Sequence, residues 1–260
     1  MSAALHILGL GPGDPDLVTL KAARILGRAP VVAGFAKRGR AGHAWSIAAP
    51  HLDPAAERLR FDYPFTVDVG VAEPRYAREM GAFYDDCAAA IAAHLAAGRE
   101  VALLCEGDPF LYGSAMYLFD RLRARHPVEV VPGIMAMAGC WARAGVPMVQ
   151  GDETLRVLPA TLPEAALAAA LAGTEAAVIM KVGRHLPKLR AVLERAGLLA
   201  RAVYVERGTQ AGEAIQPLAL RDDSPAPYFS LVLVPGRLPP SGMSGGMSGG
   251  MSGGISGGAP

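Results

Sequence analysis

The sequence contains few cysteines, and their spacing indicates neither a disulfide bond nor a shared metal site. Cys87, Cys105 and Cys140 are the three cysteines of the 260-residue chain, and each lies in an apolar stretch. No CxxC motif occurs, and the six histidines show no metal-ligand spacing. Neither a zinc site nor a disulfide framework is therefore predicted, and we expect no protein-bound metal. The three thiols are expected to be small buried side chains.

The chain also lacks a strong charge of either sign. Its 25 lysines and arginines oppose 24 aspartates and glutamates, which gives a formal net charge of +1 at pH 7. A surface with so little net charge does not draw a protein to DNA, RNA or an anionic membrane. Local basic clusters can still bind an anionic small molecule, so we expect a small-molecule substrate and no nucleic-acid or membrane partner.

Long hydrophobic runs are missing too. No apolar stretch reaches the roughly 18 residues of a membrane span. The residues up to Leu10 have no basic start followed by a long apolar run, so we predict a first strand there and not a signal peptide. Together with the unpaired cysteines, these absences predict a soluble protein of the reducing cytoplasm.

Hydrophobic residues with regular spacing are abundant, at 52% of the chain. In the first half, short apolar runs alternate with stretches of helical spacing, which is typical of a mostly parallel sheet with helices on both faces. Strands are predicted at residues 5–10, 31–35, 101–105 and 128–131. Helices are predicted at 17–26 (with Asp16 as its N-cap), 75–97, 115–123 and 135–143.

A second set of elements follows, and the chain then changes character. Strands are predicted at residues 155–158, 177–180, 202–206 and 229–234, and helices at 163–172 and 186–196. We therefore expect an α/β protein with an N-terminal lobe at 1–147, a C-terminal lobe at 148–240 and a cleft between them. Residues 241–260 repeat Met-Ser-Gly-Gly, a composition that buries too little surface to offset the entropy of ordering, so a disordered tail is predicted.

Three glycine-bearing loops are predicted at the carboxyl ends of strands in the first lobe, where open parallel sheets bind ligands. Their sequences are GLGPGDPDLVTL at 9–20, CEGDPFLYG at 105–113 and VVPGIMAMAG at 130–139. Each alone fits a tight strand-to-helix turn with no further role. Three of them in one lobe favour a binding site.

The first loop does not fit a phosphate-binding loop. In the dinucleotide pattern GxGxxG the third glycine comes later, whereas here Gly13 arrives one residue early. The lysine and the Ser/Thr of nucleotide triphosphatases are absent, and Asp14 and Asp16 would repel phosphate. Carboxylates and carbonyls at strand ends instead favour a ligand with hydroxyl groups and positive charge.

These loops resemble those of the tetrapyrrole (corrin/porphyrin) methylase family. The resemblance rests on GLGPGD at 9–14, GDP at 107–109 with Tyr112 and Gly113, and VPG at 131–133, and it extends over residues 5–237. It implies two α/β lobes, a mostly parallel N-terminal sheet, a mixed C-terminal sheet, S-adenosyl-L-methionine bound in the cleft as methyl donor, and a homodimer.

Four further segments narrow the resemblance to one branch of the family. They are FAKRGRAGHAW at 35–45, YPFT at 63–66, LCEGDPFLYGS at 104–114 and MKVGRHL at 180–186. This branch methylates the C-20 meso carbon of precorrin-2 in cobalamin biosynthesis. A branch acting on cobalt-precorrin-2 shares most of these segments, so a cobalt-bearing substrate stays an alternative. The segments at 36–44 and 180–186 argue against the uroporphyrinogen methylases of siroheme synthesis.

The resemblance also implies a set of cofactor-binding residues, matched by position. They are Pro12, Glu106, Gly107, Asp108, Leu111, Met135, Ala136, Met180 and Gly208. Met135 departs from the commoner family pattern, which has Thr or Ser there, so a hydroxyl contact is replaced by backbone contacts. Because the sulfonium of the cofactor is cationic, carboxylates and oriented carbonyls raise its affinity without a metal.

A tetrapyrrole with eight carboxylates requires cations, and basic clusters follow the predicted strands. Carboxylate binding is predicted for Lys37, Arg38, Arg40, Lys181 and Arg184. His43 and His185 belong to these two clusters in the sequence, and Arg207 follows a third predicted strand. Isolated basic residues after strands are more often solvated surface, so the prediction rests on their clustering.

The implied reaction is an in-line displacement in which an electron-rich carbon of the substrate attacks the methyl group. The protein then mainly aligns the reactants and excludes water. The meso proton goes to a side chain or to water, and Tyr112, Glu106 and His43 are the candidate bases. Two other classes stay open: a non-catalytic protein that holds a tetrapyrrole or the cofactor for a partner, and a nucleotide enzyme, which the missing loop lysine disfavours.

Overall fold

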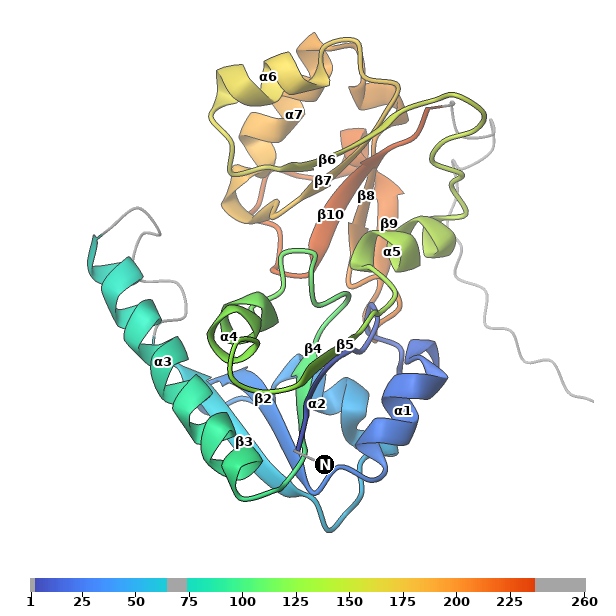
Figure 1. Ribbon diagram of the computed structural model, residues 1–260. Helices are drawn as coiled ribbons and strands as arrows, with labels where there is room; N and C mark the ends of the chain where they lie inside the picture. Colours follow the sequence, from blue (N-terminus) through green and yellow to red (C-terminus); the bar gives the residue numbers. More distant parts are fainter. Residues whose placement is uncertain (1–2, 65–73, 237–260) are drawn as a thin grey trace, which may run out of the picture.

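Five parallel strands form the sheet of the first lobe, in the order β3-β2-β4-β1-β5 (Figure 1). The computed structural model describes residues 3–64 and 74–236. The strands are β1 (Leu5–Gly9), β2 (Val31–Lys37), β3 (Glu57–Tyr63), β4 (Val101–Cys105) and β5 (Val128–Val131). Because the strands are parallel, their carboxyl ends share one edge, and β4, β1 and β5 are neighbours. The three glycine-bearing loops therefore start side by side.

Helices cover both faces of this sheet, which explains why β1 and β4 are buried along their whole length. One face packs on α3 (Pro74–Ala96) and α4 (Ala115–Leu122). The other packs on α1 (Leu20–Leu26) and α2 (His43–Ala48). Side chains alternate between these faces along β4, with Leu103 and Cys105 toward α3 and α4, and Leu104 toward α1 and α2.

The start of α1 differs from the prediction. Its N-cap is Thr19, whose Oγ accepts a hydrogen bond from Ala22 N at 3.2 Å, and not Asp16. Residues 15–17 form a separate 3-10 turn, capped by the side chain of Asp14, and Val18 is extended. The proline in this turn and the extended residue after it delay the helix by three residues.

The second lobe contains a mixed sheet in the order β6-β7-β10-β8-β9. Its strands are β6 (Leu155–Pro159), β7 (Ala176–Met180), β8 (Val203–Glu206), β9 (Ala214–Pro217) and β10 (Ser230–Val234). Only β6 and β7 pair in parallel, and the three other pairs are antiparallel. The α/β class, the parallel first sheet and the mixed second sheet are thus confirmed.

Helices also cover the second sheet on both faces. One face packs on α6 (Glu164–Leu171) and α7 (Leu186–Arg195). The other packs on α5 (Ala136–Ala144), which Figure 1 shows beside β9 although it follows β5 in the chain. The boundary at residue 147 stays a prediction. Short 3-10 helices join the elements: η1 (Pro15–Leu17), η2 (Ala49–His51), η3 (Gly183–His185), η4 (Leu199–Arg201) and η5 (Leu218–Leu220).

The prediction missed three elements, namely α2, β3 and β9. The strand β3 has the sequence ERLRFDY and lies at the sheet edge, where charged residues mask the hydrophobic pattern. Both α2 and β9 are short. The predicted tail at 241–260 and residues 65–66 of the YPFT segment lie outside the described residues.

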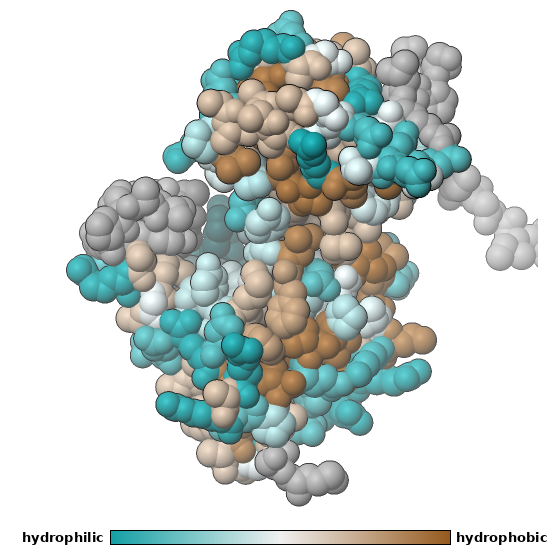
Figure 2. Space-filling model, turned by 45° about the horizontal axis from the view of Figure 1, so that its top comes forward, coloured by the Kyte–Doolittle hydropathy of each residue, from teal (hydrophilic) through white to brown (hydrophobic). Residues whose placement is uncertain are grey.

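The cysteines are buried, as predicted. Cys87, Cys105 and Cys140 are free thiols, and burial raises the pKa of each to about 12. Within residues 3–64 and 74–236, no helix is long and apolar enough to cross a membrane. Figure 2 shows hydrophobic side chains gathered along the waist of the molecule, where the two lobes meet.

Candidate functional site

The three glycine-bearing loops meet in direct backbone contact at the carboxyl edge of the first sheet. A Cβ added to Gly133 would lie 2.1 Å from the carbonyl oxygen of Gly107, and one added to Gly9 would lie 2.3 Å from Gly133 N. Neither distance is possible for a real Cβ, so only glycine fits at Gly9 and Gly133. The close approach expected of these glycines is between the loops themselves.

Hydrogen bonds then join the first two loops into one unit. Gly107 N donates to the carbonyl of Gly11 at 2.8 Å, and Gly11 N donates to the carbonyl of Gly107 at 3.3 Å. Just below them, Leu10 N donates to the carbonyl of Cys105 at 2.9 Å. The loops therefore present a fixed set of backbone groups to the cleft.

Asp108 locks the second loop to the third. Its Oδ2 accepts a hydrogen bond from Gly133 N at 3.1 Å, and its Oδ1 accepts one from Phe110 N at 2.9 Å. Both oxygens of the carboxylate thus accept hydrogen bonds from backbone groups of the loops, and Asp108 fixes the second loop against the third. Its role in cofactor binding stays a prediction.

Glu106 is placed differently, although it is only two residues away. Its Oε1 accepts one hydrogen bond, from Ala44 N in the first turn of α2 at 3.1 Å. Burial raises the pKa of the carboxyl to about 7, and the bond from Ala44 opposes that rise. The two carboxylates of the second loop therefore have different surroundings.

The second lobe reaches over to the first loop through the segment after β8. Gln210 Nε2 donates to the carbonyl of Pro12 at 3.0 Å, and Asp14 N donates to Thr209 Oγ1 at 3.3 Å. Gly139 of α5 faces Pro12 so closely that an added Cβ would lie 2.6 Å from its Cγ. Sequence analysis missed Thr209 and Gln210. The one signal that could have indicated them was their place in the loop just after a predicted strand.

The other predicted cofactor residues gather around this contact from both lobes. Leu111, Met135 and Met180 are partly buried against the same hydrophobic cluster, which lies between α5 and the second sheet. Ala136 N is 3.7 Å from the Cβ position of Gly107. A Cβ on Gly208 would lie 2.6 Å from the sulfur of Cys140, so a larger residue there would have to displace that side chain.

The basic turn after β2 is held by an arginine that sequence analysis missed. Arg60 of β3 donates to the carbonyls of Lys37 at 2.9 Å and Arg40 at 2.5 Å, and it also pairs with Asp62. The side chains of Lys37, Arg38 and Arg40 are exposed. Arg60 therefore stabilises the backbone of the turn that carries the exposed side chains of Lys37, Arg38 and Arg40.

His43 lies near positively charged residues from both lobes. Its ring packs edge-on against Phe229, with ring centroids 4.3 Å apart. Burial, Arg207 and Lys37 lower the pKa of His43, in that order of effect. Lys37 of the first lobe and Arg207 of the second thus act on the same imidazole, as expected for an anion-binding region.

A second contact between the lobes joins Tyr112 and Lys181. The Lys181 ammonium lies over the phenol ring, 4.5 Å from its centroid. Both residues have a φ of 56°, in the left-handed region that non-glycine residues seldom adopt. Arg184 is exposed on η3, where burial, Lys188 and Arg184 lower the pKa of His185.

Aromatic residues line the neighbouring ends of β2 and β3. Phe35 stacks on Tyr63, with centroids 5.3 Å apart, and the Tyr63 hydroxyl donates to Ser114 Oγ at 2.9 Å. Burial raises the pKa of Tyr63, which stays protonated. Both rings also pack on Phe83 of α3, so they form part of the core on that face of the sheet.

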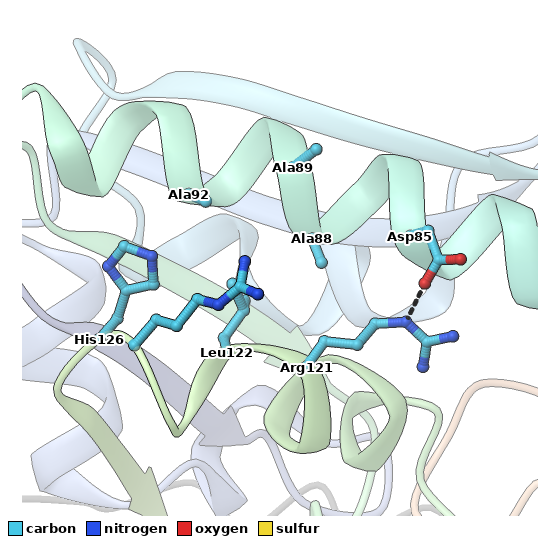
Figure 3. A pocket seen from close by; sticks show the side chains of 8 residues that line it. Asp85, Ala88, Ala89, Ala92, Arg121, Leu122 and His126 are labelled. Carbon is cyan, nitrogen blue, oxygen red and sulfur yellow. Dashed lines mark hydrogen bonds and ion pairs between the residues drawn. The ribbon is translucent and has the colours of Figure 1, made fainter.

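A separate pocket of about 330 Å³ lies between α3 and α4, away from the loops (Figure 3). Its lining includes three alanines of α3, and Arg121 in it is bound to Asp85 at 2.7 Å. Among the described residues no cluster of His, Cys, Asp and Glu could hold a metal ion.

Comparisons with known proteins show the relationships of the chain. The family Tetrapyrrole (Corrin/Porphyrin) Methylases matches residues 4–222. A precorrin-2 C(20)-methyltransferase of Sinorhizobium sp is 55% identical over 229 residues, which cover 88% of this chain and 94% of the relative. A cobalt-precorrin-2 C(20)-methyltransferase of Salmonella typhimurium is 34% identical over 239 residues, which cover 90% of this chain and 97% of the relative.

A solved structure has the same fold. It is uroporphyrin-III C-methyl transferase from Thermus thermophilus complexed with S-adenosylhomocysteine, which superposes with a TM-score of 0.61 at 22% identity, over 89% of this chain and 96% of that one. Fold and sequence thus agree. The chain belongs to the tetrapyrrole (corrin/porphyrin) methylase family.

Proposed function

We propose that this protein transfers a methyl group from S-adenosyl-L-methionine to the C-20 meso carbon of precorrin-2, giving precorrin-3A in cobalamin biosynthesis. The observation that carries the proposal is the 55% identity to a precorrin-2 C(20)-methyltransferase along nearly the whole of both chains. The cleft supports it, because loops of carbonyls and carboxylates lie beside a group of cations.

The cofactor is proposed to bind on the joined loops. Its contacts are proposed to come from Pro12, Gly107, Asp108, Leu111, Met135, Ala136, Met180 and Gly208. Glu106, the remaining residue of the predicted set, bonds to α2 on the side of the basic turn and is not assigned to the cofactor. These residues fit a cationic ligand, because the three loops carry carbonyls and four carboxylates and no lysine. S-adenosyl-L-methionine would supply an electrophilic methyl group on a sulfonium.

The substrate carboxylates are proposed to bind the exposed cations at the rim. These are Lys37, Arg38, Arg40, Lys181 and Arg184, and the position of Arg207 near His43 adds a further cation. Arginine can bind a carboxylate through two parallel hydrogen bonds, which fixes its orientation.

The protein's part in the reaction is alignment and exclusion of water. The new bond joins the C-20 carbon to the methyl group as the bond from methyl to sulfur breaks, and the C-20 proton then leaves. No nucleophile of the protein takes part, so the rate depends on holding the two carbons in line. The rigid contacts between the loops serve that purpose.

The cobalt complex of precorrin-2 is the second candidate substrate. The observation in its favour is the 34% identity to a cobalt-precorrin-2 C(20)-methyltransferase. In that case the metal belongs to the substrate, so the side chains of the protein give no ground for a choice. The chain is more similar to the precorrin-2 enzyme than to the cobalt-precorrin-2 enzyme, which favours precorrin-2 as the substrate.

A homodimer in the cytoplasm completes the proposal. The family resemblance supports the dimer, and the three free, buried thiols are compatible with a reducing compartment. Light scattering of the purified chain would measure the mass of the assembly, and a mass of about 27 kDa, that of one chain, would contradict the dimer.

The testing experiment is an anaerobic incubation with S-adenosyl-L-methionine and either precorrin-2 or its cobalt complex, analysed by mass spectrometry. We expect one added methyl on the metal-free substrate. A methyl added only to the cobalt form would establish the second candidate. A methyl on neither, with the cofactor still bound in calorimetry, would contradict both and favour another methylase or a non-catalytic binding protein.

A further inference from the structure

The end of β4 lies between the two proposed binding regions. The loops assigned to the cofactor follow β4, β1 and β5, and the basic turn assigned to the substrate follows β2. In the sheet order β3-β2-β4-β1-β5, β4 lies between β2, which leads into the basic turn, and β1, which leads into the first cofactor loop. A side chain at the carboxyl end of β4 therefore lies where the two reactants would meet.

Glu106 is the first residue after β4, and its side chain points toward the substrate side of that junction. Leu104, two residues earlier, faces α1 and α2, and Glu106 continues this alternation. The bond from Ala44 N to its Oε1 confirms the direction, since α2 begins directly after the basic turn. The carboxyl thus lies against the first turn of α2, the helix that follows the basic turn in the chain.

Two neighbouring groups, Asp108 and the candidate base His43, are less suited than Glu106 to accept the proton. Asp108 uses both carboxylate oxygens in holding the loops. His43 has the positive charges of Lys37 and Arg207 beside it, which disfavour taking up a proton. Glu106 makes one hydrogen bond through its carboxyl, and the described residues place no ion-pair partner beside it.

We propose that the Glu106 carboxylate is the base that accepts the C-20 proton in the methyl transfer. This inference rests on the proposed function. The carbon–methyl bond forms as the methyl–sulfur bond breaks, and the positive charge passes from sulfur to the substrate. The C–H bond then breaks, its electron pair returns to the conjugated ring, and the proton goes to Glu106 Oε. The neutral carboxylic acid later releases the proton to water.

The surroundings of Glu106 make this step pH-dependent in a defined direction. The titratable groups on which its charge acts are the Tyr63 hydroxyl and the Cys105 thiol, and Ala44 N donates a hydrogen bond to it. Burial raises the pKa of both Tyr63 and Cys105, so these two stay neutral between pH 6 and about 8. The pKa of Glu106 is raised to about 7. The carboxyl is protonated below that pH and cannot accept a proton, and the step becomes faster as the pH rises through it.

The test compares Glu106→Gln with Glu100→Gln, because these glutamates flank the two ends of β4. Methyl transfer is measured in single turnovers from about pH 5.5 to 8.5, and the affinity for S-adenosylhomocysteine is measured by calorimetry. For Glu106→Gln we expect a rate at least about 100-fold lower, loss of the rise with pH, and a cofactor affinity within about threefold. Glu100→Gln should match the wild type in all three.

Two further measurements keep the test decisive if Glu106→Gln folds poorly. Infrared titration of the free wild-type protein should show one carboxyl ionising near pH 7, and Glu106→Asp, which keeps the carboxyl, should retain the rise with pH at a lower rate. A Glu106→Gln rate within about threefold of wild type would overturn the proposal, and so would an unchanged pH profile or loss of cofactor binding.

Failure of the proposed function gives a different result. If the wild-type protein methylates neither precorrin-2 nor its cobalt complex, the function is wrong and this role of Glu106 falls with it. If the wild type is active and Glu106→Gln is equally active, the function stands and only the role of Glu106 is wrong.

Discussion

The two lobes contribute to the cleft in different ways. In the first lobe, backbone atoms form the contacts, and Gly9, Gly107 and Gly133 lie within van der Waals distance of one another. In the second lobe, the side chains of Lys181, Thr209 and Gln210 reach across. The first lobe thus supplies a fixed surface, and the second supplies individual contacts.

The topology of the sheets explains this difference. In the first sheet, parallel strands end at one edge, so the loops that follow them start side by side and can pack backbone to backbone. In the second sheet, β10 runs antiparallel to β7 and β8, so its start lies at the edge where those strands end. That edge gathers Phe229, Lys181 and Arg207 from three separate connections, which meet the first lobe through their side chains.

Gly133→Ala should have the largest effect, because it tests the backbone contact itself. The new Cβ would lie 2.1 Å from the Gly107 carbonyl, so one of the loops has to move. We expect a loss of about 1–3 kcal/mol in the free energy of unfolding. Cofactor binding should become undetectable in calorimetry.

The matched control for that variant is Gly81→Ala. Gly81 lies within α3, and a Cβ there would meet nothing within 4 Å. Alanine favours helix over glycine by about 1 kcal/mol, so this variant should melt at an equal or higher temperature. Normal cofactor affinity in Gly133→Ala would show that the loop contact is not needed for binding.

Asp108→Asn should have an intermediate effect, because the loops keep their glycines and lose a charged acceptor. The amide oxygen can accept from Gly133 N or from Phe110 N, but its NH₂ group cannot accept from the other. Since a hydrogen bond to a charged group is worth about 1.5–3 kcal/mol, cofactor affinity should fall about tenfold or more. Titration calorimetry measures it.

Asp120→Asn on the exposed side of α4 is the control for this prediction. It makes the same chemical change away from the loops and should leave the affinity within the error of the measurement. Equal affinities in the two variants would mean that the lock formed by Asp108 does not contribute to binding.

Lys181→Gln should have the smallest effect, because it removes one contact of the second lobe and leaves the backbone surface intact. The cation–π contact with Tyr112 is worth about 0.5–1 kcal/mol where exposed. With one cation lost at the rim, the KM for the tetrapyrrole should rise about threefold to tenfold, and the affinity for the cofactor should not change. Steady-state kinetics and calorimetry separate the two.

Lys21→Gln is the comparison for that variant, since Lys21 pairs with Glu129 near the amino end of β5, far from the cleft edge. It should leave the KM unchanged. If Lys181→Gln weakened the cofactor as much as Asp108→Asn does, the division of labour between the lobes would be wrong.

The parts predictable from the sequence were those with a local signal. Buried strands such as β1 and β4 are continuous apolar runs, and the glycines of the three loops stand at the ends of such runs. The edge strand β3 was missed because half-solvated positions carry charges, and Arg60 was missed with it. Neither a regular spacing of hydrophobic residues nor a sequence motif indicates such residues.

Contacts between distant segments left no local signal either. Gln210 reaches Pro12 across 198 residues of sequence, and Lys181 meets Tyr112 only after both lobes have folded. The resemblance supplied the list of cofactor residues, but the different surroundings of Glu106 and Asp108 became visible only in three dimensions. Two carboxylates that are two residues apart look alike in a sequence.

The brace that Arg60 forms under the basic turn has an energetic consequence. Lys37 and Arg40 are fixed at their carbonyls by one guanidinium, which is itself held by Asp62. The backbone entropy of this turn is therefore lost when the chain folds and not when the substrate arrives. By ordering the backbone of the turn, Arg60 can in this way raise the affinity of three neighbouring side chains for the substrate.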